Sequence, residues 1–446
     1  MLSKIASWRH VRWSRRDVAV CAVLITIAAA LRFWNLTSLG LTHFDEGAYT
    51  MTGRWLATFA REGTAFQPTF SPPLFPSLVG AAFMILGVKD YVAIIPSILT
   101  GSITVGLLYL IGSTWFGMRV GIGAALMLAT AEYHLVFSRL ALTDATFILL
   151  FWAALWCLFE AISTGKRHWF VAGGVVTGLC WNTKYHGFLP LAITGLWLTL
   201  RALSGERPAF RGFAIACGIA VTAYLPWAVY VQATIGYPAL LRTHIEHSVG
   251  LGLFVTKPSA FVFYFSHWLA TPLLVCASGG VLASLVEGRS AARFLFFTTG
   301  MFLALATTYL SFPRLVLPVV PAICLFAAYG LDAARTLRFN APIALVAGTA
   351  LTIVWTEPRD SALLAMRTDA YRQAAAYVRS ADRPVISQLS SNYYFYEATP
   401  SVEMRFHTGS ELEKTLWRYC GVQALCEWRL RGSTQREARV RILQAG

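Results

Sequence analysis

Two adjacent carboxylates, Asp45 and Glu46, stand in a His-Phe-Asp-Glu-Gly run shortly after the first apolar segment of the chain. One carboxylate can deprotonate an acceptor hydroxyl while its neighbour raises its pKa by charge repulsion. The same pair is suited to a divalent cation. In a third interpretation the run is a solvated loop, and Asp45 only caps a helix that begins at Gly47. Acid–base chemistry, cation binding and helix capping all remain open at this point.

Charged residues also interrupt the apolar runs further along the chain. Arg139 and Asp144 flank a turn at which the chain re-enters an apolar run, and Lys184 lies in the polar segment 182–186. Charges close to lipid are costly unless they are paired or hydrated, so these residues are functional candidates. Lys184 would suit an anionic head group. The simpler interpretations are an Arg139–Asp144 pair that anchors two helix ends and a Lys184 side chain that extends to the membrane surface.

Arg314 stands at the entrance of a late apolar run, within the segment Tyr309 to Pro321. Arginine offers a forked set of donors for phosphate oxygens, although an isolated structural arginine is the simpler alternative. His244 and His247 are spaced to bind a metal from one helix, but no third ligand follows at helical spacing. Their segment is better explained as a loop that covers the site, and the use of a metal stays open.

The composition predicts a membrane protein. Hydrophobic residues make up 56% of the 446-residue chain and charged residues 13%, whereas about a quarter of the residues in a soluble domain are charged. The net charge of +15 is explained by basic residues at the cytoplasmic ends of membrane helices, without nucleic-acid binding. The first apolar run, Asp17 to Phe33, follows a basic head and has no small-residue cleavage site, which predicts an uncleaved signal anchor.

The order of apolar runs and basic turns predicts the topology. Further runs of membrane-spanning character fall at 91–113, 119–137, 142–162, 168–183, 186–203, 211–231, 261–286, 293–311, 314–332 and 340–356. With a cytoplasmic N-terminus, the basic turns all fall inside only if 72–87 does not cross. That stretch opens with two prolines, which favours an interfacial or re-entrant helix. We therefore expect an α-helical polytopic membrane protein with about 11 to 13 transmembrane helices.

The same topology divides the chain into a membrane domain over 1–356 and an extracytoplasmic tail over 357–446. It places a long first loop (35–90) and a second loop (232–260) on the outer face, where nearly all the unusual polar residues fall. In the tail, 370–379 has helical periodicity and 384–389 reads as a strand, which suggests a small C-terminal α/β domain. Cys420 and Cys426 lie in this tail, and whether they pair is open.

Several motifs resemble the GT-C superfamily of polyprenyl-phosphate-dependent glycosyltransferases, especially its protein O-mannosyltransferase and lipid A aminoarabinose transferase branch. They stand in the family's order: FDEGAY, SPPLFPSLVGAAFMILG, SRLALTD and YLSFPRLVLPVVPAICL, with NTKYHGFLPL also similar. The resemblance covers roughly residues 20–330. It implies a GT-C-like fold with juxtamembrane helices in the first loop. The family often has His or Lys before the Pro-Pro pair, where this chain has Ser71, so a metal or phosphate contact there is not expected.

The resemblance also implies a reaction, namely transfer of a sugar from a polyprenyl-phosphate donor to an acceptor hydroxyl, with inversion at the anomeric carbon. The acceptor is a protein, lipid A or another glycan, and the use of a divalent cation stays open. The implied catalytic residues are Asp45 as base, Glu46 and Asp144. The implied donor phosphate-binding residues are Lys184, Arg314, Arg139 and Tyr309. Further candidate substrate contacts are His43, Tyr49, Tyr185 and His186.

Other classes of membrane protein remain as rivals. A secondary transporter or flippase predicts polar residues near the bilayer midplane, whereas here they cluster at one face. An O-antigen polymerase or ligase would share the lipid-linked donor and the outer cations, and a non-catalytic scaffold is a further alternative. The favoured interpretation is an enzyme of a bacterial inner membrane, with the active site and the C-terminus extracytoplasmic. It requires Asp45, Lys184 and Arg314 to converge on one outer cavity.

Overall fold

The computed structural model of this protein describes residues 14–61, 71–247, 255–309, 311, 313–333, 340–380, 386–387, 395–396 and 402–403. The first helices are α1 (Arg15–Phe33), η1 (Leu36–Ser38), α2 (Phe44–Ala57), α3 (Leu74–Leu86), α4 (Asp90–Trp115), α5 (Met118–Ala129), α6 (Glu132–Phe137) and α7 (Thr143–Thr164). Next come α8 (Arg167–Trp181), α9 (Leu189–Leu203), α10 (Phe210–Thr234), α11 (Tyr237–His247), α12 (Pro258–Trp268), α13 (Thr271–Glu287) and α14 (Ser290–Ala306). The last elements are η2 (Pro313–Val319), α15 (Val320–Ala333), α16 (Ala341–Ala365), α17 (Ala370–Ser380), β1 (Ile386–Ser387) and β2 (Val402–Glu403).

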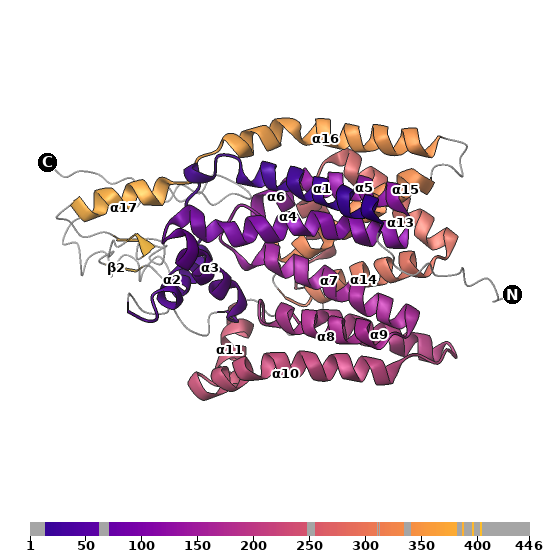
Figure 1. Ribbon diagram of the computed structural model, residues 1–446, viewed down its shortest axis with the longest axis horizontal. Coiled ribbons are helices and arrows are strands. Elements are labelled where there is room, and N and C mark those ends of the chain that lie inside the picture. The colour runs from indigo at the N-terminus through magenta and orange to yellow at the C-terminus, as the bar shows by residue number, and fades with distance from the viewer. Residues whose placement is uncertain are drawn as a thin grey trace.

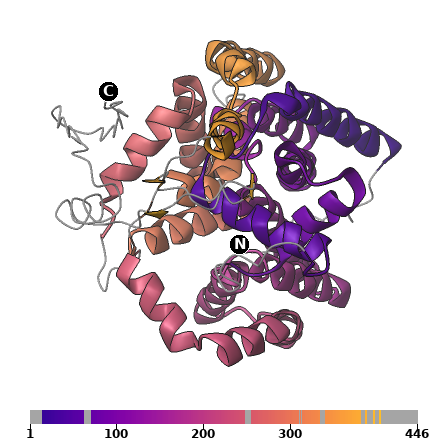
Figure 2. The same ribbon diagram turned by 90° about the vertical axis from the view of Figure 1, so that its left-hand side faces the viewer.

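The chain is a polytopic α-helical membrane protein. Within the described ranges, five segments are long and apolar enough to cross a bilayer: α1 with η1, α4, α7, α10, and η2 with α15. Shorter apolar helices accompany them, namely α3, α5, α9, α13 and α14. The long helices run side by side along the longest axis of the molecule, with α16 and α10 on opposite sides of the bundle (Figures 1 and 2). Helices α4, α7 and α15 are mostly buried and form its centre.

Two of the predicted runs are broken in the structure. The run 119–137 divides into α5 and α6, because the helix ends at Ala129 and a new one begins at Glu132. The run 261–286 divides into α12 and α13 at Leu269 and Ala270, ahead of a proline in the first turn of α13. Proline lacks the backbone N–H that would continue the preceding helix, so the break follows from the sequence. Helix α16 extends past 356 to Ala365.

The stretch 72–87 forms α3, a separate short helix that packs against α2. Both lie at the same end of the bundle as α17 and α11 (Figure 1). The first turn of α3 is fixed from outside, because the Leu74 N–H donates to the Asn182 carbonyl at 2.9 Å. Gly87 ends the helix with φ +82°, a left-handed conformation that favours glycine. These contacts agree with a helix that stays at the edge of the membrane domain.

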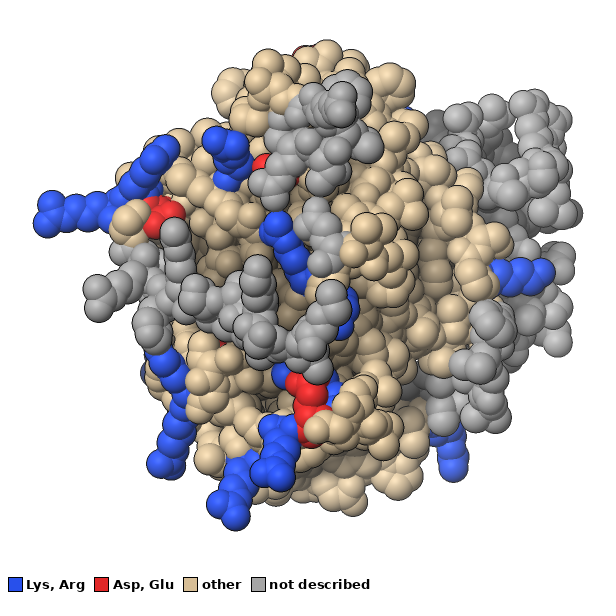
Figure 3. All heavy atoms as spheres, turned by 90° about the vertical axis from the view of Figure 1, so that its right-hand side faces the viewer, with Lys and Arg blue, Asp and Glu red and all other residues tan. Residues whose placement is uncertain are grey.

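Basic side chains gather at the opposite end of the bundle, which carries the N-terminal end of α1 (Figures 1 and 3). The turns that were expected to be cytoplasmic contain Arg119, Lys166, Arg167, Arg201, Arg207, Arg211, Arg289 and Arg293. The two ends of the bundle therefore differ in character, with first-loop and tail elements at one end and basic turns at the other. The positive-inside rule predicts that the basic end faces the cytoplasm.

Little of the tail is described. Helix α17 confirms the helix expected over 370–379, and β1 lies within the expected strand and pairs in parallel with β2. The α/β domain around these elements stays a prediction, and Cys420 and Cys426 lie outside the described residues.

Candidate active site

Asp45 lies in the first turn of α2, where local hydrogen bonds fix the helix start. The Asp45 N–H donates to Nδ1 of His43 at 3.1 Å. In return the His43 N–H donates to Oε2 of Glu46 at 2.8 Å, which completes a capping box. The exposed positive end of the helix dipole favours a carboxylate at this position. The interpretation in which Asp45 caps a helix that begins at Gly47 is therefore wrong, because His43 is the N-cap and the helix already begins at Phe44. The Asp45 carboxylate is left for other contacts.

The Asp45 carboxylate forms an ion pair with Arg314, which stands in the first turn of η2. The guanidinium donates to Oδ2 at 2.5 Å, although the two residues are 269 positions apart. The Asp45 side chain is 12% exposed and that of Arg314 is 25% exposed. The pair is thus largely enclosed but still reachable by a small ligand.

A second ion pair joins Asp144, in the first turn of α7, to Lys184, in the turn between α8 and α9. The Lys184 ammonium donates to Oδ1 of Asp144 at 2.7 Å. It also lies 5.3 Å from the centre of the Phe147 ring, within the range of a cation–π contact. Side-chain exposures of 14% and 3% show that this pair is more deeply buried than the first.

The two ion pairs belong to one electrostatic cluster. Arg314 is attracted by both Asp45 and Asp144. His43 interacts with Asp45, Asp144 and Arg314, and partial burial lowers the pKa of its ring below the ordinary value. Two carboxylates and two cations therefore balance within one cluster. A phosphate that entered would have to compete with the carboxylates for the cations.

Glu46 points away from this cluster. Its Oε1 accepts the Ala141 N–H at 2.7 Å, and its Oε2 accepts the N–H groups of Thr42 and His43. The side chain is fully buried. These contacts tie α2 to the turn before α7 and occupy both carboxylate oxygens. The geometry gives Glu46 a positioning role in place of the acid–base role expected from its place beside Asp45.

Arg139 also lies apart from the cluster. Its guanidinium donates to the Trp34 carbonyl at 2.7 Å and to the Leu363 carbonyl at 3.3 Å. The simple interpretation in which Arg139 pairs with Asp144 is wrong, because Asp144 pairs with Lys184 instead. Arg139 thereby links the turn before α7 to the ends of α1 and α16, and these contacts occupy donors expected to bind phosphate.

The remaining candidate substrate-binding residues lie around the cluster of ion pairs. Tyr49 packs edge-on against Phe75 at 5.5 Å, and burial raises the pKa of its hydroxyl. The His186 ring lies 4.8 Å from Phe147, beside Lys184. Tyr185 is the least central, since its hydroxyl interacts with Trp227 of α10.

Tyr309 contacts the second loop. Its carbonyl accepts from the Thr256 hydroxyl at 2.7 Å, and its ring packs near Phe261 and Val316. Ser71 donates to the neighbouring Pro72 carbonyl at 3.3 Å. None of these contacts shows a ligand role, so the substrate contacts stay predictions.

Two further residues at this end escaped the sequence analysis. The Tyr133 hydroxyl donates to the Pro313 carbonyl, directly before Arg314, and its ring stacks on Trp268 at 5.4 Å. Arg32, fully buried near the end of α1, has a guanidinium nitrogen 2.9 Å from Nδ1 of His134. The sequence carried a signal for each residue. Arg32 is a charged residue at the end of an apolar run, and Tyr133 belongs to a Tyr-His pair shortly before the turn that Arg139 and Asp144 flank.

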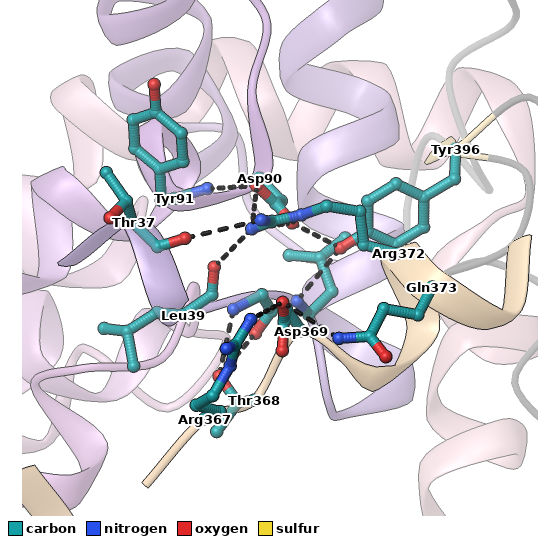
Figure 4. Close-up of polar contacts among 12 residues, drawn as sticks. Thr37, Leu39, Asp90, Tyr91, Arg367, Thr368, Asp369, Arg372, Gln373 and Tyr396 are labelled. Carbon is teal, nitrogen blue, oxygen red and sulfur yellow. Dashed lines mark hydrogen bonds and ion pairs between the residues drawn. The ribbon is translucent and has the colours of Figure 1, made fainter. Parts of the chain in front are cut away.

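The segment before Asp45 is held by the tail (Figure 4). Arg372 of α17 forms a forked ion pair with Asp90, with both oxygens at 2.8 Å, and donates to the Leu39 carbonyl at 2.8 Å. The Tyr396 hydroxyl donates to Asp90 at 2.7 Å and accepts the Leu41 N–H at 3.3 Å. The tail therefore fixes the backbone only a few residues before the capping box of α2.

In the described part of the chain, no group of three or more His, Cys, Asp or Glu side chains is arranged so that it could hold a metal ion. The two carboxylates of the cluster, Asp45 and Asp144, each already pair with a cation. The donor set thus does not fit a divalent cation at this place without breaking those pairs.

Comparison with solved structures identifies the fold. The structure superimposes on crystal structures of ArnT from Cupriavidus metallidurans, one of them bound to undecaprenyl phosphate. For that one the TM-score is 0.66 at 16% identity, over 90% of this chain and 88% of the ArnT chain. An archaeal oligosaccharyltransferase, AglB from Archaeoglobus fulgidus, gives a TM-score of 0.61 at 14% identity, over 88% of this chain and 61% of AglB. The chain has the GT-C fold.

Sequence comparison adds partial matches to a mannosyltransferase family model and to two putative mannosyltransferases. Residues 71–194 match a family model described as dolichyl-phosphate-mannose-protein mannosyltransferase. A putative mannosyltransferase of Bacillus subtilis, YkcB, is 25% identical over 244 residues, which is 52% of this chain and 33% of YkcB. A second one, YycA, is 24% identical over 171 residues, 38% of this chain and 25% of YycA. The chain thus aligns with a third or less of these relatives. The matched family region contains Asp144 and Lys184 but neither Asp45 nor Arg314.

Proposed function

We propose that this chain is a membrane glycosyltransferase that moves a sugar from a polyprenyl-phosphate donor onto the hydroxyl of an acceptor. The observation that carries the proposal is the cluster in which Asp45 pairs with Arg314 beside the Asp144–Lys184 pair. One carboxylate within reach of solvent and two fixed cations are what base-assisted displacement at a phosphate-linked sugar needs. The GT-C fold, shared with an ArnT structure that holds undecaprenyl phosphate, supports a lipid-linked donor.

In the proposed reaction the acceptor oxygen attacks the anomeric carbon from the side opposite the phosphate. The bond between that carbon and the phosphate oxygen breaks, and polyprenyl phosphate leaves with the bonding electrons. Asp45 takes the proton of the acceptor hydroxyl, and the attack inverts the anomeric centre. Arg314 and Lys184 stabilise the negative charge of the leaving phosphate, which is worth more in a site shielded from water.

The ion pairs of the ligand-free cluster fit this sequence of events. Before the donor binds, Asp45 and Asp144 neutralise the cations and so reduce the cost of enclosing them. When the donor phosphate enters, it competes for Arg314 and Lys184, because arginine binds carboxylates and phosphates with the same forked geometry. That exchange would release the Asp45 carboxylate to act as base.

We further propose a bacterial plasma membrane as the location, with the cluster, the first loop and the tail on the outer face. The accumulation of basic residues at the other end of the bundle supports this orientation. Substituted-cysteine labelling of intact cells, at Arg61 and at Arg207, tests it. Labelling of an Arg61→Cys variant but not of an Arg207→Cys variant by a membrane-impermeant reagent is expected, and the reverse pattern would overturn the orientation.

The reaction is tested in proteoliposomes that contain the full chain, a labelled polyprenyl-phosphate sugar pool and a cell-envelope extract as acceptor. Asp45→Asn should lower transfer by roughly 10²- to 10⁴-fold, the usual contribution of a general base. The matched control is Asp369→Asn, which removes a carboxylate between α16 and α17. This variant should leave transfer unchanged. An Asp45→Asn variant with the wild-type rate would rule out the base role.

The same assay separates the rival class. A flippase would move the lipid-linked sugar across the bilayer without breaking the sugar–phosphate bond, so label would stay in the lipid fraction. The lipid-linked compound that accumulates in cells lacking the protein would identify the sugar.

A further inference from the structure

The segment that carries Arg314 is rich in proline. Helix η2 is a seven-residue 3₁₀-helix with Pro313 at its start and Pro318 inside it, and Pro321 follows in the first turn of α15. Proline has no N–H group, so it cannot donate to the carbonyl one turn before it. Buried carbonyls that are left in this way need donors from other elements of the structure.

Aromatic side chains of neighbouring helices supply such donors on both sides of Arg314. The indole N–H of Trp152, in α7, donates to the Pro318 carbonyl at 2.9 Å. The hydroxyl of Tyr264, in α12, donates to the Ser311 carbonyl at 2.9 Å. The backbone before and after Arg314 is therefore attached to two different helices, and its course depends on side chains that are far away in sequence.

Tyr133, in α6, makes the contact that lies nearest to Arg314. Its hydroxyl donates to the Pro313 carbonyl, and this C=O group belongs to the same planar peptide unit as the N–H of Arg314. A bond that fixes the oxygen of a planar unit also fixes the direction of its N–H. The Tyr133 ring is fully buried, with its plane 16° from that of Trp268 and its edge against Phe137 at 5.8 Å.

The short helix that carries Tyr133 is itself held in place. The buried guanidinium of Arg32, in α1, donates to Nδ1 of His134 at 2.9 Å and to the Ala129 carbonyl, at the end of α5, at 3.4 Å. The Ser138 hydroxyl donates to the His134 carbonyl at 2.6 Å. Helix α6 is thus bonded to its neighbours on either side of Tyr133, which gives the Tyr133 hydroxyl a defined place.

We propose that Tyr133 is a positioning residue for Arg314. Its hydroxyl orients the peptide unit from which the Arg314 side chain extends, so that the guanidinium faces Asp45 in the ligand-free site and the donor phosphate after binding. The part played by the phosphate rests on the function proposed above, whereas the orientation of Arg314 does not. Tyr133 itself makes no contact with the substrate in this proposal and acts only through Arg314.

Steady-state kinetics of Tyr133→Phe in the proteoliposome assay test this role. The substitution removes one hydroxyl and keeps the ring that stacks on Trp268. The KM for the polyprenyl-phosphate sugar should rise roughly three- to tenfold with little change in kcat, the effect of one hydrogen bond. In an Arg314→Gln background the same substitution should have no further effect, because the side chain that it orients is absent. The matched control is Tyr109→Phe, which removes a buried hydroxyl that donates to Asp17 at the basic end and should keep the wild-type KM.

Arginine-specific labelling tests the orientation without the transfer reaction. The purified full chain is treated with phenylglyoxal, and peptide mass spectrometry measures the rate of modification of Arg314. Arg201, which pairs with Glu206 at the basic end, is the internal reference. Arg314 should react roughly threefold faster or more in Tyr133→Phe than in the wild type or in Tyr109→Phe, as expected when one hydrogen bond is lost. Arg201 should react equally in all three proteins.

Three results would overturn the proposal. The first is equal labelling of Arg314 in the wild type and in Tyr133→Phe. The second is a Tyr133→Phe variant that unfolds at a lower temperature but keeps the wild-type KM, as expected for a tyrosine with only a structural role. The third is a full additional effect in the Arg314→Gln background, which would show that Tyr133 acts through another residue. If the wild type transfers no sugar, the proposed function fails, while the labelling still decides the positioning role.

Discussion

The guanidinium of Arg314 and the carboxylate of Asp45 form an ion pair at 2.5 Å, with one partner in the first turn of α2 and the other in the first turn of η2. The contact joins the first loop to the last third of the chain. It holds the proposed base beside a proposed phosphate ligand in a largely enclosed site.

This pair predicts that the shape of the cation matters as well as its charge. Arg314→Lys keeps the charge but loses the planar fork that can serve a carboxylate and a phosphate. We expect transfer to fall roughly 10- to 100-fold, mainly through weaker donor binding, as for a lost charge-assisted hydrogen bond. Steady-state kinetics with varied donor would show a raised KM. Full activity of Arg314→Lys would mean that only the charge is used.

His43 predicts a pH dependence. The pKa of its ring is lowered from the ordinary value of 6.5 by partial burial, so the neutral ring is favoured in the folded protein. Below pH 6.5 the unfolded chain binds a proton that the folded chain does not, and stability therefore falls with falling pH in this window. Thermal unfolding between pH 7 and pH 5 measures the slope. His43→Asn, which can still cap α2 but does not titrate, should flatten it. An equal slope in this variant would place the titration elsewhere.

The Asp144–Lys184 pair predicts a separation of stability from activity. Lys184→Met leaves the buried Asp144 carboxylate without its partner and should cost about 3–5 kcal/mol of unfolding free energy. The double variant Lys184→Met with Asp144→Asn removes both charges and should recover most of this loss. Transfer should be lost in both variants, because the cation for the donor phosphate is missing. Recovery of transfer in the double variant would contradict the role of Lys184.

The Arg372–Asp90 contact predicts that the tail can be loosened selectively. Arg372→Gln removes a forked pair to a buried carboxylate and should cost about 1.5–3 kcal/mol. Arg367→Gln removes the Arg367–Asp369 pair, whose arginine is 66% exposed, and should cost much less, because solvent screens an exposed ion pair. Limited proteolysis after Ala365 compares the two variants with the wild type. Equal protection of all three proteins would show that the tail is held by other contacts.

Two adjacent glycines of α13 provide a test of the helix packing. A Cβ at Gly280 would lie 1.8 Å from the Phe326 carbonyl of α15, whereas one at Gly279 would meet nothing within 4 Å. Gly280→Ala should therefore lower the unfolding temperature strongly, because backbones packed this closely cannot both stay in place. Gly279→Ala should be neutral or slightly stabilising. A similar unfolding temperature for both variants would mean that α13 and α15 are further apart.

The sequence by itself determined the membrane class, the order of the GT-C motifs, the helix at 370–379 and the status of 72–87 as a separate short helix. The membrane class and the tail helix rest on composition and on local periodicity, which the chain carries within windows of about 20 residues. The status of 72–87 rests on the positions of the basic turns, and the motif order rests on the family resemblance. The sequence also indicated that Asp45, Asp144, Lys184 and Arg314 would all lie on the same side of the membrane.

Only the tertiary structure decided which of these charges pair. Arg139 is five positions from Asp144 in sequence, yet Asp144 pairs with Lys184, 40 positions away. Glu46 is adjacent to Asp45 but turns to the Ala141 backbone. Neighbouring positions at a helix start project in different directions, and partners far apart in sequence meet only through helix packing. The pairs therefore depend on how α2, α7, the turn after α8 and η2 come together, which local patterns do not encode.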